Sequence, residues 1–170
     1  PQLVLLFGAT SYAVSSVLAV FFIGMGVGSL WGGRLAARTS RPLYWYGFFE
    51  ILIGLWAVAI IVLADHGGEA VAALLRPFAA SRALGIALRG LLTLAFLIVP
   101  VTLMGATLPL LSQFVARERR VLGRRVGGLY TLNTFGAVAG CAFAGFYLIE
   151  HMGYLRATCL GAAANVLVGA

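Results

Sequence analysis

The stretch TSYAVSSVLAVFFIGMGVGSLWGGRLAARTSR, residues 10–41, decides the fold of this chain. Its first 24 residues carry no charge, and three arginines follow at Arg34, Arg38 and Arg41. A helix needs about 20 apolar residues to cross the hydrocarbon core of a bilayer, and a central Arg costs roughly 2.5–3.5 kcal/mol on insertion scales. Residues 10–33 therefore predict a transmembrane helix that ends in a basic loop.

The same helix carries glycines four residues apart, at Gly24, Gly28 and Gly32. Positions at this spacing share one helix face. Small residues there let two helix backbones approach closely, which is a main packing device inside a membrane. We therefore expect this face to pack against another helix.

Apolar stretches of similar length recur through all 170 residues. The chain is 62% hydrophobic and only 10% charged, with a mean hydropathy of +1.02. Soluble domains are nearer ~45–50% apolar and ~25% charged, so a soluble globular protein is excluded. We predict an all-α, multi-pass transmembrane helical bundle forming one domain fragment, residues 1–170. The expected spans are 10–33, 43–64, 88–111, 126–149 and a truncated 157–170, with 1–8 as the tail of an earlier helix or an interfacial stretch.

The loops between these spans alternate in charge. Loop 34–41 holds three Arg and no acid, and loop 117–125 holds five Arg and one Glu, whereas loops 65–82 and 150–156 are balanced. Short loops rich in Arg stay on the cytoplasmic side, so we expect loops 34–41 and 117–125 to be cytoplasmic. The net charge of +7 does not indicate nucleic-acid binding, because the basic residues lie between membrane spans.

Glu50 is the one charge inside the second span. Gly47 and Gly54 share its helix face, so we expect the carboxylate to face neighbouring helices rather than lipid. An intramembrane carboxylate is by default a functional hypothesis: a proton relay, a cation site or the partner of an Arg. The structural alternative is a shallow Glu that reaches the cytoplasmic interface or forms a pair there.

Two further polar stripes fall within predicted spans. Thr102 lies between Pro100 and Pro109, where a hydroxyl can bond a carbonyl freed by proline; a substrate contact is the alternative. In the fourth span, Tyr130 and Asn133 share a face with Gly140, and Asn133 is expected either to hydrogen-bond across helices or to belong to a polar site. Helix packing is expected at Gly136 and Gly140.

The remaining features favour no catalytic role for this segment. Two roles are open for Arg34, Arg38 and Arg41: they take part in gating, or they only set the orientation of the chain in the membrane. Their expected partners are helix carbonyls, a carboxylate or lipid phosphate. Cys141 and Cys159 are expected to be buried, inert thiols. No nucleophile motif, metal-ligand spacing or cofactor-binding loop is present, so we predict no metal, no cofactor and no catalytic residue.

A family resemblance rests on two sequence segments, MGATLPLL (residues 104–111) and LYTLNTFGAVAG (residues 129–140). With the glycine-rich first span and the Glu50 span, they resemble the membrane region of bacterial fused proteins. Those proteins join a transporter-like helical domain to a spermidine-synthase-like domain. The resemblance implies the bacterial inner membrane, a helix before Pro1, and a downstream aminopropyltransferase-like domain of the same parent chain.

A looser resemblance connects GGRLAARTSRP (residues 32–42) to the loop between the second and third helices of the major facilitator superfamily. Gly33, Leu35, Arg38 and Arg41 fit that family's pattern, but its Asp position is Ala37. This likeness implies that the chain covers part of a six-helix half. The departure at Ala37 weakens any transfer of the family's gating mechanism.

These expectations lead to three functional hypotheses. The chain anchors a synthase domain in the membrane, or it also carries a small cationic metabolite of the polyamine type. In the third hypothesis, the chain is half of a secondary transporter with no attached enzyme.

Overall fold

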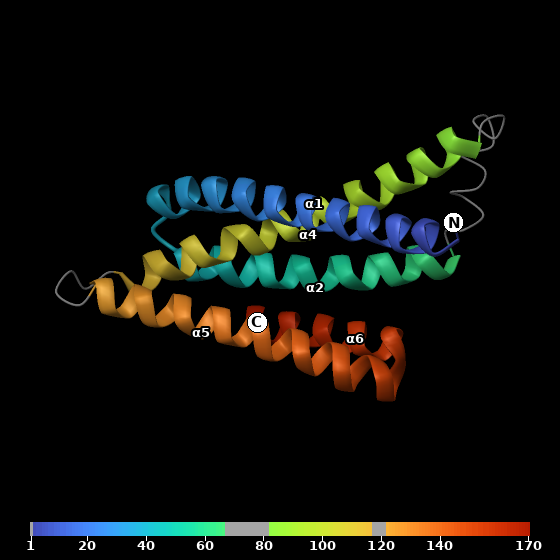
Figure 1. Cartoon of the computed structure of the whole chain (residues 1–170). Helices are drawn as coiled ribbons and strands as arrows, with labels where there is room; N and C mark the ends of the chain where they lie inside the picture. The colour runs from blue at the N-terminus through green and yellow to red at the C-terminus, as the bar shows by residue number, and fades with distance from the viewer. Residues whose placement is uncertain (1, 67–81, 117–121) are drawn as a thin grey trace.

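The computed structural model describes residues 2–66, 82–116 and 122–170 (Figure 1). Within these ranges the chain is helical, which confirms the predicted all-α class. The helices are α1 (Gln2–Arg38), α2 (Pro42–His66), α4 (Arg82–Val115), α5 (Leu122–Phe143), the π-helical turn η3 (Ala144–Leu148) and α6 (Ile149–Gly169).

Four described segments are long and apolar enough to cross a bilayer: Val14–Arg38, Pro42–Leu63, Gly90–Val115 and Arg125–Gly169. By length and composition, these segments support the predicted multi-pass membrane character. Residues 2–7, expected to be a separate tail or interfacial stretch, are instead the first turns of α1, which continues through Gly8 into the first span. Helix α4 runs without interruption through Pro100 and Pro109, so it is not broken.

The last apolar segment is too long for one crossing, and Gly153 divides it. Its φ of 76° and ψ of 163° interrupt the helix there, and Figure 1 shows the chain reversing direction at this end. Glycine tolerates positive φ because it has no Cβ. The reversal lies in segment 150–156, which the sequence predicts to connect two spans.

Helix ends alternate between the two sides of the bundle (Figure 1). The end of α1, the start of α2, the end of α4 and the start of α5 share one side. Arg34, Arg38, Arg41 and Arg125 belong to these ends. The Gly153 reversal and the start of α1 lie on the opposite side. These four arginines thus lie on one side, while Arg156 lies near the Gly153 reversal on the other. The assignment of the first side to the cytoplasm stays a prediction.

Close backbone contact holds α1 against α4. A Cβ added to Gly32 would lie 2.5 Å from the Ala106 Cα, and one added to Gly28 would overlap the Thr102 carbonyl. A Cβ added to Gly24 would likewise lie too close to the side chain of Val101. These glycines therefore allow an approach that no larger residue permits. Beside them, Phe49 of α2 is 2% exposed, Ala106 and Leu110 are fully buried, and Trp31 stacks on Phe49 with ring centroids 5.4 Å apart.

A side chain of α2 supplies a backbone hydrogen bond that α4 lacks. Pro100 has no N–H to donate to the carbonyl of Phe96, four residues earlier. The indole Nε1 of Trp56 donates to that carbonyl at 3.1 Å. Thr102, expected to bond a carbonyl freed by proline, donates to the Ile98 carbonyl at 2.7 Å instead. The carbonyl that Pro100 leaves without a donor is thus bonded by a neighbouring helix and not by α4 itself.

Helix α5 contributes little to this packing. It contacts α4 and η3, and its residues Leu132 and Phe135 are each 73% exposed. Open space surrounds Gly136 and Gly140, so the expected packing face at these glycines meets no neighbour in the described part of the chain.

The glycine contact predicts a position-dependent effect of adding one methyl group. Gly28→Ala should destabilise the bundle by about 1–3 kcal/mol, because the new Cβ must push α4 away. Gly26→Ala is the matched control, since nothing lies within 4 Å of a Cβ there. Unfolding in mixed detergent micelles, followed by circular dichroism, measures both. Equal midpoints for the two variants would contradict the packing described.

The Trp56 bond predicts a coupled pair of substitutions. Trp56→Phe should cost about 0.6–1.7 kcal/mol, the range measured for hydrogen bonds between membrane helices. The same change in a Pro100→Ala background should cost much less, because position 100 then donates to the Phe96 carbonyl itself. A double-mutant cycle by the same unfolding assay tests this, and additive costs would refute the coupling.

Candidate intramembrane carboxylate site

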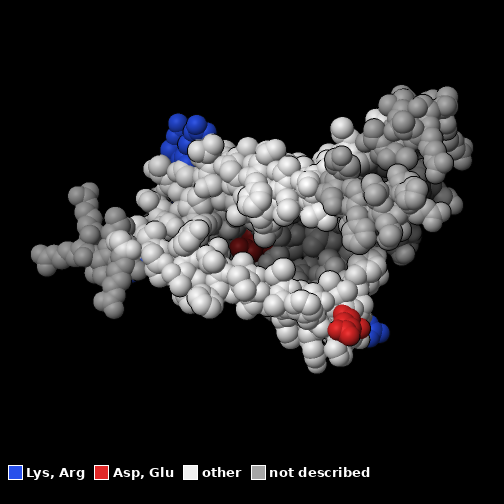
Figure 2. Space-filling model, viewed as in Figure 1, with Lys and Arg blue, Asp and Glu red and all other residues white. Residues whose placement is uncertain are grey.

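Glu50 lies in α2, about 12 Å along the helix axis from Pro42. Its side chain is half-buried, and the hydroxyl of Tyr46, one turn earlier, donates a hydrogen bond to its carboxylate. Figure 2 shows acidic atoms at the floor of a hollow in the face of the molecule, with other acidic atoms at its outer edge. The second span therefore places a carboxylate inside the bundle, with a defined donor beside it.

The glycines around Glu50 bring α6 close to α2. A Cβ on Gly47 would lie 2.6 Å from the Gly169 carbonyl oxygen, and one on Gly54 would lie 2.7 Å from the Ala162 carbonyl oxygen. The sequence spacing puts these two glycines on the Glu50 face and predicts neighbouring helices there. In the structure they form the α2–α6 contact, which lies beside the carboxylate.

A pocket of about 570 Å³ opens between the start of α2 and the end of α6. Tyr46 lines it together with Tyr44, Gly47 and Gly169. Because Tyr46 also bonds Glu50, one side chain connects the pocket with the carboxylate. Carboxylate oxygens and aromatic rings together suit an organic cation.

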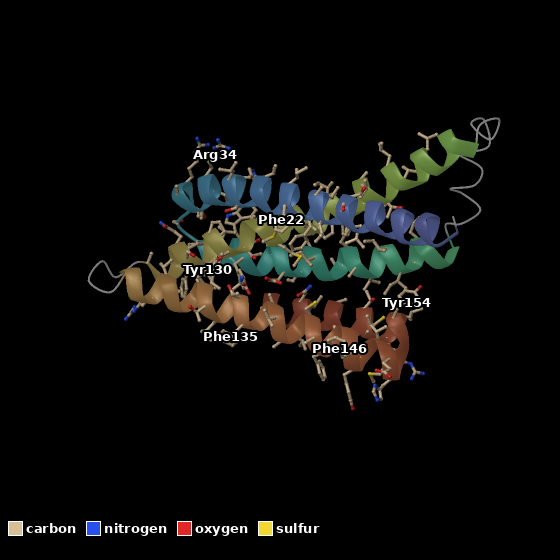
Figure 3. All side chains as sticks on the ribbon, in the orientation of Figure 1. Phe22, Arg34, Tyr130, Phe135, Phe146 and Tyr154 are labelled. Atoms are coloured by element: carbon tan, nitrogen blue, oxygen red, sulfur yellow. The ribbon has the colours of Figure 1, made fainter. Side chains whose placement is uncertain are left out.

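The other polar candidates lie elsewhere. Thr102 is half-buried at the α1–α4 contact, where its hydroxyl bonds its own helix. Tyr130 is 62% exposed and Asn133 is exposed, both on α5, which runs along the edge of the bundle (Figure 3). Glu50, Thr102, Tyr130 and Asn133 thus do not form one site within the described residues.

The arginines expected to gate the bundle lie at its end. Arg34, Arg38 and Arg41 are exposed, and Figure 3 shows Arg34 pointing away from the helices. Arg41 precedes Glu50 by nine residues, about 13 Å along α2. Gating by these residues stays a prediction.

One sequence expectation needs revision. Cys141 and Cys159, expected to be buried, are free and exposed, because they lie on the open surfaces of α5 and α6. Tyr46, not singled out from the sequence, is the hydrogen-bond donor to Glu50. Its four-residue spacing from Glu50 was the available signal, since such pairs meet on a helix.

Comparison with protein-family models, curated proteins and solved structures finds no match to this chain.

The Tyr46 bond predicts the chemical accessibility of Glu50. Tyr46→Phe should increase labelling by a hydrophobic carbodiimide severalfold, because the carboxyl oxygen is then free to add to the reagent. Tyr44→Phe is the matched control, because Tyr44 is 65% exposed and has no carboxylate one helical turn away. Mass spectrometry of the α2 peptide quantifies the label, and Glu50→Gln should abolish it. Equal labelling in Tyr46→Phe and the unaltered chain would argue against the bond.

Proposed function

We propose that this chain is an integral membrane domain that binds a small organic cation at Glu50 and carries it across the bilayer. The observation that carries the proposal is the half-buried Glu50 carboxylate, held by Tyr46 inside a membrane span. Burying an unneutralised charge at this depth is costly, so such residues pair with another charge or serve a solute.

The surroundings of Glu50 favour an ammonium group as the solute's charge. Tyr44 and Tyr46 line the adjoining pocket, and aromatic faces attract cations by roughly 0.5–2 kcal/mol. The arginines Arg34, Arg38 and Arg41 belong to the helix ends and are exposed, so a cation from solution can serve as the counter-charge within the span.

The family likeness of the sequence supports a wider assignment. On this proposal the chain is the transporter-like domain of a bacterial inner-membrane protein, its fold part of a major-facilitator half. The solute is of the polyamine type, the parent chain continues into a spermidine-synthase-like domain, and loops 34–41 and 117–125 are cytoplasmic. Two alternatives are a membrane anchor for that domain, without transport, and half of a secondary transporter that carries no enzyme.

Solute uptake tests the carrier proposal. The intact protein in proteoliposomes should accumulate labelled spermidine, and Glu50→Gln should reduce uptake about tenfold or more, the effect of losing roughly 1.4 kcal/mol of binding. Glu150→Gln is the control, because Glu150 lies in the first turn of α6 and is exposed.

Three results are informative. Loss of uptake in Glu50→Gln alone supports the carrier. Equal uptake in the unaltered protein and Glu50→Gln refutes a role for the carboxylate. No uptake by folded, unaltered protein refutes polyamine carriage and favours the membrane anchor.

A further inference from the structure

A second cavity lies on the basic side of the bundle and is formed by other helices than the α2–α6 pocket. Its volume is about 500 Å³, and it lies where the end of α1, the end of α4 and the start of α5 meet. Most of its walls are small or apolar, including Ala36, Ala37 and Pro109. Such walls suit hydrocarbon and glycerol groups better than a hydrated ion.

Polar groups are confined to one wall of this cavity. Ser112 and Gln113, consecutive on α4, contribute a hydroxyl and an amide. Ser112 is half-buried and Gln113 is exposed. Both can donate a hydrogen bond to an oxygen of a headgroup.

Arginines adjoin the lining on two helices. Arg38 follows Ala37 at the end of α1, and Arg125 precedes Val126 near the start of α5. Arg38 is exposed and lies in the last turn of α1, at the same end as the cavity. Arginine binds phosphate with several N–H donors at once, and basic pockets between membrane helices bind anionic headgroups.

We propose that this cavity is a binding site for an anionic phospholipid of the surrounding bilayer. The acyl-glycerol part occupies the apolar groove between α1, α4 and α5, the phosphate lies at Arg38, and Ser112 and Gln113 bond headgroup or ester oxygens. The lipid thereby fills the gap beside α5, whose packing against the other helices is otherwise sparse. This site does not depend on solute binding at Glu50.

Native mass spectrometry of the intact protein in detergent tests the proposal. Dioleoyl phosphatidylglycerol should bind about tenfold more tightly than dioleoyl phosphatidylcholine. Arg38→Gln should weaken phosphatidylglycerol binding about fivefold, the fold-change equivalent to ~1 kcal/mol per basic residue near a membrane surface. Arg156→Gln, an exposed arginine three residues after the Gly153 reversal, is the control and should change nothing.

Two further variants separate the cavity from surface charge. Ala37 and Ala59 are both exposed, but only Ala37 lines the cavity. Ala37→Phe should therefore fill the groove and abolish tight binding, whereas Ala59→Phe adds the same ring to α2 outside the cavity and should not. If Ala37→Phe disturbs folding, Gln113→Leu serves instead, because it removes only the amide from an exposed position and should weaken phosphatidylglycerol binding.

Each contrary result overturns the proposal. If folded Ala37→Phe binds phosphatidylglycerol as tightly as the unaltered protein, the cavity is not the binding site. If Ala37→Phe does not fold, unchanged binding in Gln113→Leu leads to the same conclusion. Equal losses in Arg38→Gln and Arg156→Gln indicate unspecific attraction to basic surface. Displacement of the lipid by millimolar inorganic phosphate identifies a free anion as the ligand.

Discussion

The hydrocarbon core of a bilayer offers no water to bond a polar group, and this constraint shapes the whole chain. Backbone donors and acceptors must be satisfied inside the protein, so the spans are helical. Where Pro100 removes a donor from α4, the indole of Trp56 supplies one from α2. Where Glu50 brings a carboxylate into a span, Tyr46 supplies a hydroxyl. Both polar groups are thus bonded by a side chain, and the Trp56 bond, which joins two helices, also fixes α2 relative to α4.

Glycine decides which helices approach one another. No hydrophobic force drives helices together in lipid, so close packing must be built from small side chains. Gly28 and Gly32 bring α1 onto α4, while Gly47 and Gly54 bring α6 onto α2. Gly136 and Gly140 have the same spacing yet meet only open space among the described residues. The motif therefore permits contact without specifying a partner.

Helix class, span positions and the grouping of basic ends could be predicted from sequence, because hydropathy and charge act locally. The packing of the Glu50 face against a neighbouring helix could be predicted too, because the spacing of Gly47 and Gly54 puts both on that face. Contacts between distant segments could not. Nothing near Trp56 indicates that its partner is the carbonyl of Phe96, 40 residues later. Equally, nothing in the sequence around Asn133 indicates that α5 makes few contacts with the other helices.

The Trp56–Phe96 bond also limits how this bundle can move. An indole that reaches across to a single carbonyl fixes both the height and the axial rotation of α2 relative to α4. Sliding α2 like a piston, or turning it about its own axis, would break this bond and expose a bare carbonyl to lipid. Rocking of α1, α2 and α4 as one rigid unit keeps it intact. Any conformational cycle that preserves this bond is thus restricted to tilting motions, with α5 and the Gly153 reversal left as the adjustable parts.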